Sequence, residues 1–390
     1  MYKYNVYLPH YFGGFQCTTS ECKDNCCKQP WDISIDKETF DRFMRLEKAI
    51  RVECREKINI ISRNPFSAEV VRSENGECTF LDDSGHCTIH LRLGPEYLSG
   101  ICMCYPRTFC SVEGDIEAFL HLSCEAAAEL VLLDQSIMSF EEVVLESEKP
   151  LDISYMLDVG EYTAASNAVE AFWKLRTVSI VIVQSRQYDI HLRLKYLGLF
   201  IKMIQEQLSS GNDEGISDFA DQFLEGLESR LFDELAEQLH GGVDFDIEFV
   251  LDIIDEFEKK DFKLLNAYIR DFRAGMGLSA GDRKVSEGFF DKYNMYYEKH
   301  LADREYIFEN LIVNHIFAAG FPFNYVLQDS VVKNYRELII KFNLIKTLLV
   351  GVCGHDGRSD DKRIVECVSS FLKVFDHRKR IDGTRDETAR

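Results

Sequence analysis

Cysteine is the residue type that most constrains this chain, because eleven of its thirteen cysteines lie within the first 124 residues. Four of them occur in the short run Cys17-Thr-Thr-Ser-Glu-Cys22-Lys-Asp-Asn-Cys26-Cys27. Thiols at this density serve in disulfides, in metal binding or in redox chemistry. The choice among these three uses decides most of what the sequence says about function.

The rest of the sequence favours metal binding over disulfides. Residues 1–10, MYKYNVYLPH, lack the basic segment and long apolar core of a secretory signal. No stretch approaches the roughly 18 consecutive apolar residues that a membrane span needs. We therefore expect a cytoplasmic protein without a membrane partner, and disulfides seldom persist in that compartment. The uneven number of cysteines, thirteen, also argues against a closed disulfide framework.

The strongly acidic composition bears on the class of partner. The formal net charge is −21, whereas binding to nucleic acid phosphates requires basic patches. We therefore expect no nucleic acid partner. An acidic surface suits a cationic protein or peptide substrate, but it also serves simply to keep a protein soluble.

The hydrophobic periodicity predicts a mainly α protein with two regions: an irregular cysteine-rich, metal-binding head over residues 1–135 and an α-helical body over 136–390 that need not fold independently. In the head, Asp36 should cap a helix running to about residue 61, which places Cys54 in the core. Residues 77–81 and 86–90 read as a short β-hairpin joined at Asp82–Gly85. In the body, we expect helices at roughly 125–134, 161–184, 187–209, 214–239, 246–272, 283–299, 303–318, 333–350 and 359–376.

The spacing of the cysteines suits a metal centre built on loops. Cys17-x4-Cys22-x3-Cys26 offers three ligands within ten residues, and Cys78 and Cys87 face each other across the expected hairpin. Common zinc sites use two well-separated C-x2-C pairs, which are missing from this sequence. Fe–S clusters accept more varied spacing because their ligands come from the corners of a larger object. The spacing therefore favours an Fe–S cluster but leaves zinc open.

Neighbouring side chains usually diverge, so we do not expect Cys26 and Cys27 to bind one small ion together. His86, His90 and His121 could add a nitrogen ligand, although surface or hydrogen-bonding roles are commoner for such histidines. Cys104 and Cys110 could each be a ligand, a resolving thiol or a small core residue, and the core role is favoured for both. Cys353 and Cys367 lie in helical patterns and read as core residues.

A family resemblance rests on these same residues. Phe15-Gln-Cys17-x4-Cys22-x3-Cys26-Cys27, followed by Trp31-Asp-Ile-Ser-Ile-Asp36, resembles the N-terminal signature of bacterial flagellin lysine-N-methylases, part of a broader group of cysteine-cluster proteins described as zinc- or iron-chelating. The resemblance extends over essentially the whole chain. It continues through Glu77-Cys78-Thr-Phe-Leu81, Cys87, Leu98-Ser-Gly-Ile-Cys102, Tyr105-Pro106-Arg107, Leu122-Ser-Cys124, Glu309-Asn-Leu-Ile-Val-Asn-His-Ile-Phe317 and Phe321-Pro-Phe323.

The resemblance implies an enzyme that transfers methyl groups from S-adenosylmethionine to lysine ε-amines of flagellin. It also implies an Fe–S cluster, expected to be 4Fe-4S, with zinc as the alternative metal. The cysteines that match the family pattern, and are therefore the implied metal ligands, are Cys17, Cys22, Cys26, Cys27, Cys78, Cys87, Cys102 and Cys124.

Methyl transfer to lysine needs a neutral amine, because the ε-amine is normally protonated at neutral pH. Tyr97 and Tyr105 adjoin the cysteine motifs and are candidate catalytic residues, with packing as their alternative role. Arg107 is a candidate for binding the methionyl carboxylate of the cofactor through its fork of N–H groups, or for anchoring its loop. The glycines at 351, 354 and 357 lack the βαβ context of a nucleotide site and read instead as a helix end.

Two hypotheses from different classes remain. The first is an Fe–S-containing protein lysine methyltransferase that acts on flagellin. The alternative is a non-enzymatic protein that chelates iron or zinc through its cysteines. Redox cycling of Cys26 with Cys27, or of Cys102 with Cys104, is less favoured, because a disulfide between adjacent cysteines closes a strained ring. The sequence does not predict an oligomeric state.

Overall fold

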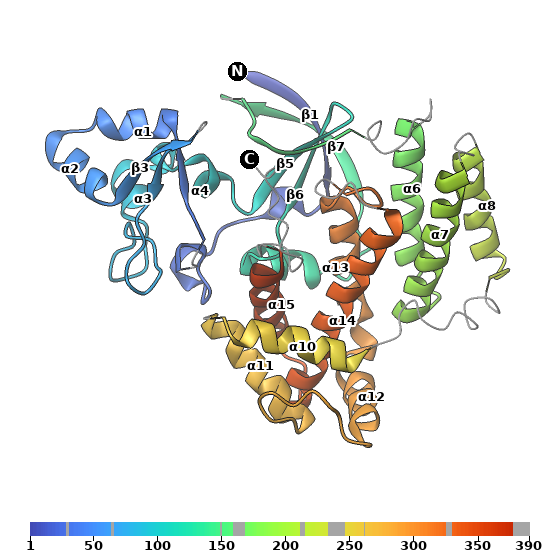
Figure 1. The fold of residues 1–390 in the computed structure, drawn as a ribbon. Coiled ribbons are helices and arrows are strands. Elements are labelled where there is room, and N and C mark those ends of the chain that lie inside the picture. Colours follow the sequence, from blue (N-terminus) through green and yellow to red (C-terminus); the bar gives the residue numbers. More distant parts are fainter. Residues whose placement is uncertain are drawn as a thin grey trace.

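Two hydrophobic cores divide the protein into an N-terminal lobe and a larger body (Figure 1). The buried residues of the lobe core fall within 33–89, whereas the body core combines residues 6–15 with residues 109–375. The chain therefore starts in the body, leaves it for the lobe and then returns. The computed structural model describes residues 1–28, 31–63, 66–148, 150–158, 168–210, 215–232, 246–260, 262–324 and 330–376.

A five-stranded mixed sheet forms the N-terminal part of the body. Its strands, in spatial order, are β7 (Phe140–Ser147), β1 (Tyr2–Pro9), β6 (Asp115–Leu120), β5 (Arg107–Val112) and β8 (Ile153–Leu157). The β1 strand pairs antiparallel with β7 and parallel with β6. We did not predict this sheet. Because β7 and β8 follow residue 135, the sheet joins segments from both sides of the expected seam between head and body.

The lobe is a small α+β unit rather than an irregular head. Its elements are β2 (Ser34–Asp36), α1 (Lys37–Met44), α2 (Lys48–Glu56), β3 (Ile58–Arg63), β4 (Phe66–Val70), α3 (Thr88–Leu93) and α4 (Gly100–Cys104). Asp36 caps α1 as predicted, accepting a hydrogen bond of 2.8 Å from the Thr39 N–H. The expected single helix to residue 61 is wrong. A break after Met44 divides it, and the β-branched run INIISR then forms β3. Cys54 is buried as predicted.

The expected hairpin over residues 77–90 is reduced to a turn and a bridge. The Asp82 carboxylate accepts hydrogen bonds of 2.9 Å from the Ser84 and His86 N–H groups and so holds the turn. Leu81 and Cys87 form an isolated antiparallel bridge. The second strand does not form, because α3 begins at Thr88.

The helices of the body follow the predicted pattern closely. Their bounds are α5 (Glu125–Leu132), α6 (Ala168–Val183), α7 (Ile190–Ser210), α8 (Ile216–Glu228), α10 (Ile247–Glu258), α11 (Lys263–Met276), α12 (Phe289–His300), α13 (Glu305–Ala318), α14 (Val331–Asp356) and α15 (Asp361–Phe375). Two predictions are wrong: the helix expected over 246–272 is two helices, α10 and α11, and the helix expected over 214–239 already ends at Glu228 in α8. Residues 211–213 and 241–242, which fall in the gaps between the predicted helices, lie outside the described residues.

The longest helix, α14, is the central helix of the body. It is long and apolar enough to pass as a membrane span by length and composition, but 83% of its apolar window is buried inside the protein. It packs against α7, α11, α12 and α15. It continues beyond the predicted end at residue 350, through Gly351 and Gly354, and ends at the last of the three glycines, Gly357, with a left-handed φ of 69°. Cys353 and Cys367 are buried core residues, as expected.

Glycines allow α11 and α14 to cross at very close range. A Cβ added to Gly275 would overlap the Gly351 carbonyl oxygen, and one added to Gly351 would overlap the Phe272 ring. The two helices therefore approach to a distance that no larger residue permits. This crossing fixes the position of α14, and through it that of α15.

We expect Gly275→Ala to lower the free energy of unfolding by about 1–3 kcal/mol, because the added methyl group forces the two helices apart. In an ordinary helix the same change is stabilising by about 1 kcal/mol. Urea denaturation measures the difference. Gly13→Ala is the control, since nothing lies within 4 Å of the added Cβ there. An unchanged or raised stability of Gly275→Ala would contradict the close crossing.

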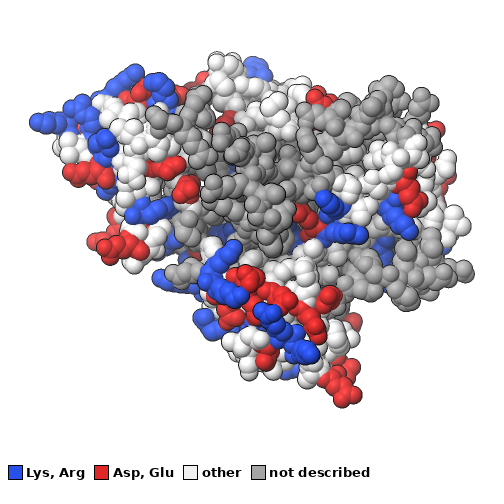
Figure 2. Space-filling view, in the orientation of Figure 1, with Lys and Arg blue, Asp and Glu red and all other residues white. Residues whose placement is uncertain are grey.

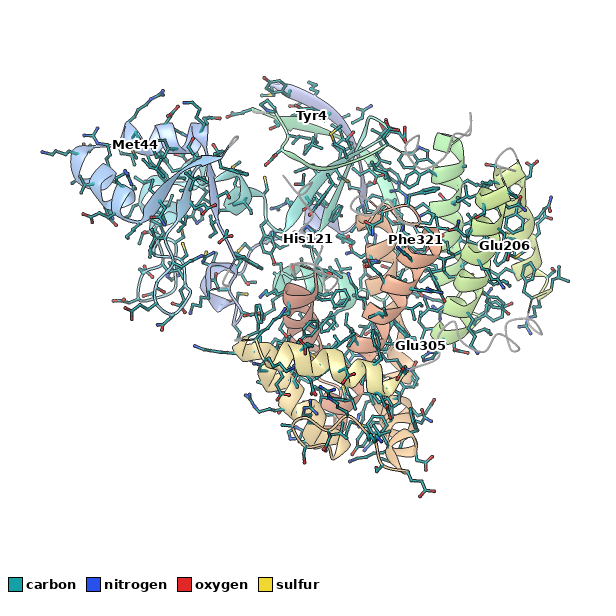
Figure 3. All side chains as sticks on the ribbon, viewed as in Figure 1. Tyr4, Met44, His121, Glu206, Glu305 and Phe321 are labelled. Carbon is teal, nitrogen blue, oxygen red and sulfur yellow. The ribbon has the colours of Figure 1, made fainter. Side chains whose placement is uncertain are left out.

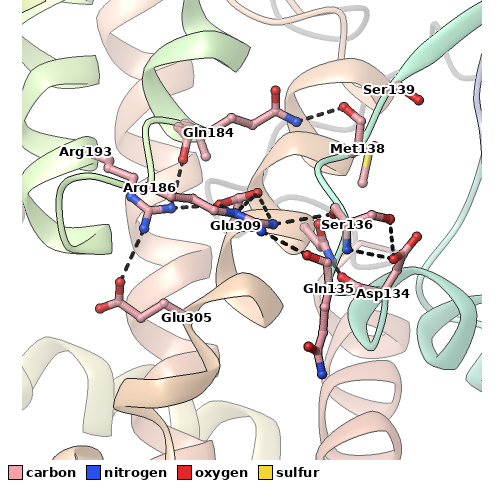
Figure 4. Close-up of polar contacts among 12 residues, drawn as sticks. Asp134, Gln135, Ser136, Met138, Ser139, Gln184, Arg186, Arg193, Glu305 and Glu309 are labelled. Atoms are coloured by element: carbon pink, nitrogen blue, oxygen red, sulfur yellow. Dashed lines mark hydrogen bonds and ion pairs between the residues drawn. The ribbon is translucent and has the colours of Figure 1, made fainter. Parts of the chain in front are cut away.

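A row of buried polar residues on α13 connects the helices of the body (Figure 4). Glu309 is fully buried and accepts hydrogen bonds from the Arg186 Nε and from the Arg193 guanidinium, at 2.9 and 2.8 Å. Arg186 also donates to the Gln135 carbonyl at 2.9 Å. A buried charge is tolerated only with such partners. Glu309 therefore holds the link between α6 and α7, and the segment after α5, against α13.

Two asparagines continue this row toward the N-terminal sheet. The Asn310 side chain donates to the carbonyls of Val131 and Asp134, at 3.0 and 2.6 Å, and so satisfies the end of α5. Asn314 donates to the Leu120 carbonyl at 3.4 Å and accepts a hydrogen bond from the Tyr11 hydroxyl. The motif at 309–317, which carries part of the family resemblance, thus has a structural role in joining the body helices to the sheet.

Two histidines of the body are held in the neutral state. His315 is bonded to the Lys341 Nζ at 3.0 Å, and His191 is bonded to the Lys346 Nζ. Burial, and then the adjacent ammonium, lower the pKa of His315 to about 3 and that of His191 to about 4. A histidine in the unfolded chain titrates near about 6.5. The unfolded chain therefore binds protons between these values that the folded protein does not bind.

We expect stability to fall as the pH decreases from about 6.5 to about 4, and each neutral histidine to add up to about 1.4 kcal/mol per pH unit to this slope. His315→Gln should reduce the slope in that window, as measured by denaturation at several pH values. His355→Gln, at a solvent-exposed histidine of α14, is the control for the substitution itself. Equal slopes in the wild type and His315→Gln would contradict a buried neutral histidine.

Charged side chains of both signs lie on the surface of the protein. On the face shown in Figure 2, acidic and basic side chains alternate over the lobe and over α10 and α11. This arrangement is typical of a surface that keeps a protein soluble. The net charge of −21 therefore includes many charges that lie close to a group of the opposite sign.

Candidate functional site: the cysteine cavity

A cavity of about 950 Å³ is lined by residues of both the lobe and the body. All eight cysteines of the family pattern lie in its wall: Cys17, Cys22, Cys26, Cys27, Cys78, Cys87, Cys102 and Cys124. Cys54, Cys104 and Cys110 are not among the described residues that line it. The structure thus brings together the cysteines that the sequence groups and leaves the other three apart.

The path of the chain explains this convergence. The segment that leaves the body for the lobe carries Cys17 to Cys27, and the segment that returns carries Cys102 in α4. The backbone of Cys78 forms an isolated antiparallel β-bridge with that of Arg72. The Cys78 N–H also donates a hydrogen bond of 2.8 Å to the Cys27 carbonyl. Two further cysteines occupy the residue before a helix: Cys87 before α3 and Cys124 before α5. The cavity therefore lies where the two parts of the protein are connected.

Cys26 and Cys27 face the same cavity, contrary to the expected divergence of adjacent side chains. They lie in a 3-10 turn, Cys26–Lys28, rather than in a strand, so successive side chains do not alternate between faces. A hydrogen bond from the Cys27 thiol lowers the pKa of Cys26 to about 7, and the same bond raises the pKa of Cys27. The pair can therefore hold one thiolate readily, stabilised by the thiol beside it.

Other thiols of the cavity are held protonated. The Cys22 thiol is 3.5 Å from a Glu125 carboxylate oxygen, and burial is the main cause that raises its pKa to about 12. Burial also raises the pKa of Cys124 to about 11, although the Ala127 and Ala126 N–H groups at the start of α5 oppose this shift. Metal binding by these thiols would therefore release protons.

The eight cysteine sulfurs of the cavity are the kind of donor atom that a thiol-bound metal centre needs. Eight thiols around one cavity suit an Fe–S cluster or zinc, both of which prefer thiolate ligands. Within the residues that the structure describes, no three His, Cys, Asp or Glu side chains converge closely enough to hold a single metal ion. The cysteines are spread over the wall, and their assignment as ligands stays a prediction.

The candidate residues outside the cysteine set also reach this cavity. Tyr97, Tyr105 and Arg107 all line it. The Tyr105 hydroxyl is 3.0 Å from the Ser123 Oγ, and burial raises the pKa of Tyr105 well above its usual value. Arg107 donates to the Phe15 carbonyl at 3.1 Å and stacks on the Phe15 ring. Of the two roles considered for Arg107, the structure shows the anchoring of a loop.

The three histidines considered as nitrogen ligands are placed differently. His86 and His90 line the cavity. His121 lies near the centre of the molecule, where its ring contacts the Phe119 ring edge-on, with 5.3 Å between the ring centroids (Figure 3). It is not among the described residues of the cavity wall.

Comparison with known proteins identifies the family. Residues 176–384 match the family described as "FliB lysine N-methylase C-terminal domain". The chain belongs to the FliB lysine N-methylase family. It is similar to the proteins named lysine-N-methylase of Salmonella choleraesuis (strain SC-B67) and Salmonella typhimurium (strain LT2), with 28% identity over 145 residues in each case. That stretch is 36% of this chain and 36% of each relative, so the match spans about a third of their length.

A further relative is the flagellar biosynthetic protein FliU of Salmonella muenchen. It is 28% identical over 145 residues, which cover 36% of this chain and 85% of that protein. No solved structure matches the chain. The family is thus established by sequence, while the geometry of the site rests on the present structure.

The FliB-family segment itself reaches the cavity, a contribution that we did not predict. Lys373 of α15 lines the cavity, and its nearly buried Nζ donates to the carbonyl oxygen and, at 2.7 Å, to the carboxylate of Asp24. Asp24 lies between Cys22 and Cys26. The helix α15 therefore holds residues 17–27, the cysteine segment, in place through a buried ion pair.

A second set of contacts strengthens the same attachment. The Lys23 Nζ is 2.8 Å from a Glu366 carboxylate oxygen, and the Tyr268 hydroxyl donates to Glu366 at 2.7 Å. Glu366 and Lys373 lie seven residues apart on the buried face of α15. Two charges on an otherwise apolar helix face are the signal that could have revealed a partner segment.

We expect Lys373→Met to loosen the cysteine segment, because the substitution leaves the Asp24 carboxylate without its buried partner. Such a loss destabilises a protein by about 3–5 kcal/mol. Hydrogen exchange of residues 17–27 should accelerate, and Cys22 and Cys26 should react faster with a thiol reagent. Lys362→Met, at an exposed lysine of the same helix, is the control. Unchanged exchange and thiol reactivity in Lys373→Met would contradict the attachment.

Proposed function

We propose that this protein transfers methyl groups from S-adenosylmethionine to lysine ε-amines of flagellin, and that the cysteine cavity holds an Fe–S cluster, of the 4Fe-4S type. One observation carries the proposal: the family cysteines and the candidate residues Tyr97, Tyr105 and Arg107 line a single cavity. Membership of a family named for lysine N-methylation supports it, as does the flagellar name of one relative. We further propose that it acts in the cytoplasm.

The cavity has the size expected of a site for a small-molecule cofactor. Ligand sites commonly measure about 300–1,000 Å³, and this one measures about 950 Å³. Its wall is largely apolar, with contributions such as Ile33, Phe80 and Leu98 from the lobe. An apolar wall disfavours a charged lysine and so favours the neutral amine that attack requires. The cavity therefore suits the entry of a lysine side chain.

In the proposed methyl transfer, the lysine nitrogen forms a bond to the methyl carbon of S-adenosylmethionine, and the bond between that carbon and the sulfonium sulfur breaks. The sulfonium becomes a thioether, S-adenosylhomocysteine, and the nitrogen releases a proton. Because Tyr105 keeps its proton at neutral pH, we assign it hydrogen-bond donation and positioning rather than proton acceptance. Arg107 has N–H groups beyond the one bound to Phe15 with which to hold the methionyl carboxylate.

The cysteines would hold the cluster, which supplies a bound iron centre inside the cavity. Their number exceeds the four thiolates that a 4Fe-4S cluster needs. The distribution of eight thiols around the wall favours a multi-iron object over one tetrahedral ion. The alternative function, iron or zinc chelation without catalysis, requires only these cysteines. It makes no use of Tyr105 or Arg107.

We expect the protein purified without oxygen to absorb broadly in the visible range and to lose this absorption in Cys22→Ser and Cys78→Ser. Cys54→Ser is the matched control, since Cys54 is buried in the lobe core and is not among the cavity residues. Iron and zinc analysis decides the metal. A colourless protein with stoichiometric zinc would overturn the cluster.

The same preparation tests the enzyme. Incubation with labelled S-adenosylmethionine and flagellin should add mass in steps of one methyl group to flagellin lysines. We expect Arg107→Lys to raise the concentration of S-adenosylmethionine needed for half-maximal methylation by about tenfold. Lysine lacks the two parallel N–H groups with which arginine binds a carboxylate. Absence of transfer by a protein with a fully loaded metal centre would leave metal chelation as the function.

A further inference from the structure

A second cavity, of about 480 Å³, lies between the N-terminal sheet and α6, away from the cysteines. The sheet contributes residues of β1, β6 and β7, and α13 contributes Phe317. Gln184 and Met138 also line it, and the Gln184 side chain donates to the Met138 carbonyl at 2.8 Å (Figure 4). None of its described lining residues is a cysteine, so it is distinct from the site proposed above.

The walls of this cavity are aromatic. The Tyr7, Phe140 and Phe317 rings form a cluster, with 4.8 Å between the centroids of Phe140 and Phe317 and 5.9 Å between those of Tyr7 and Phe140. Trp173 of α6 adds an indole ring. Aromatic faces attract cations and also pack well against methylene groups.

One cationic side chain of the protein, Arg176, already lies against these rings, and the Glu117 carboxylate neutralises its charge. The Arg176 guanidinium stacks on the rings of Trp173 and Phe317, at 4.6 and 4.9 Å from their centroids. It also forms a buried pair with Glu117, with 2.8 Å between Nη1 and Oε2. Arg176 and Glu117 together therefore contribute no net charge to the cavity.

The remaining charged residues of the lining are Asp115 and Glu142, and both are acidic. Glu142 lies directly opposite Tyr7 in the β1–β7 pairing. Glu117, the partner of Arg176, lies opposite Tyr7 in the β1–β6 pairing. Residues two apart share a face of a strand, so Asp115 lies on the same face as Glu117. Asp115 and Glu142 are exposed, and neither forms an ion pair with any described residue. They give the cavity a net formal charge of −2 at neutral pH.

We propose that this cavity binds an aliphatic ammonium, specifically a lysine side chain of a protein. The aromatic wall would pack against the methylene groups, and the two carboxylates at the rim would attract the ammonium. A divalent cation is disfavoured, because such ions require a shell of oxygen ligands that this aromatic wall does not provide. The choice of a protein lysine over a free polyamine rests on the proposed function. The cavity would hold a lysine-bearing segment of the substrate apart from the reacting centre.

The test measures binding without any methyl donor, so that it is separate from methyl transfer. The probe is the peptide acetyl-Gly-Ser-Lys-Ser-Gly-amide, titrated into the full-length protein at low salt. In a Trp31→Phe background, Trp173 is the one remaining tryptophan, and its fluorescence reports on this cavity. The same peptide with norleucine in place of lysine keeps the apolar chain and lacks the charge.

We expect the lysine peptide to bind and the norleucine peptide to bind at least about fivefold more weakly. The double variant Asp115→Asn, Glu142→Gln should lose about fivefold in affinity for the lysine peptide. Glu141→Gln is the control for the Glu142 substitution, because it removes one carboxylate from the adjacent position of β7 on the opposite face of the sheet. The three carboxylate substitutions change solvent-exposed residues, and thermal denaturation verifies that the variants and the Trp31→Phe background fold.

Three results would overturn the proposal. They are the absence of lysine-peptide binding to the wild type, equal affinity of the wild type and the double variant, and equal affinity for the lysine and norleucine peptides. Cadaverine distinguishes the source of the ammonium. If it binds as tightly as the peptide, the cavity is a polyamine site and the assignment to a protein lysine is wrong.

Discussion

The buried polar row on α13 is the interaction on which the rest of the structure depends. Glu309 fixes Arg186 and Arg193, Asn310 satisfies the end of α5, and Asn314 reaches the sheet. Each group is costly to bury alone, so the three demand one arrangement of helices and strands. Because Cys124 precedes α5, this arrangement also sets the body side of the cysteine cavity.

The cavity exists because two hydrophobic cores meet without merging. The lobe core and the body core are separate clusters, and the connecting segments between them are short and rich in cysteine. Polar or metal-bound groups are more easily accommodated at such a junction than inside either core. A thiol-bound centre there would join the lobe to the body, and its binding energy would then contribute to folding as well as to chemistry.

The sequence predicted the helical body well and the sheet poorly, for a physical reason. The body helices carry a local period of 3.6 residues, which can be seen without knowledge of any partner. Strand β1, in contrast, pairs with residues more than a hundred positions away, such as Ile116 and Val143. Half-buried edge strands such as β7 also show little hydrophobic contrast.

The site shows the same division between local and distant information. The grouping of eight cysteines was predictable, because spacing and family resemblance mark them within one short region. The roles of Lys373 and Glu366 were not, because they come from the far end of the chain. The side-by-side orientation of Cys26 and Cys27 depends on a 3-10 turn, which a pattern of two adjacent cysteines does not predict.

The family segment, residues 176–384, is attached to the N-terminal region at both of its ends. At its first residue, Arg176 forms a buried ion pair with Glu117 of the sheet. Near its last, Lys373 forms another with Asp24 of the cysteine segment. Each pair buries a charge that needs its partner, so neither region satisfies its own charges alone. These two ion pairs therefore link the helical segment to the N-terminal sheet and to the segment that carries Cys17 to Cys27. The segment contributes Lys373 to the lining of the cysteine cavity, and residues of α6 and α13 to the lining of the aromatic cavity.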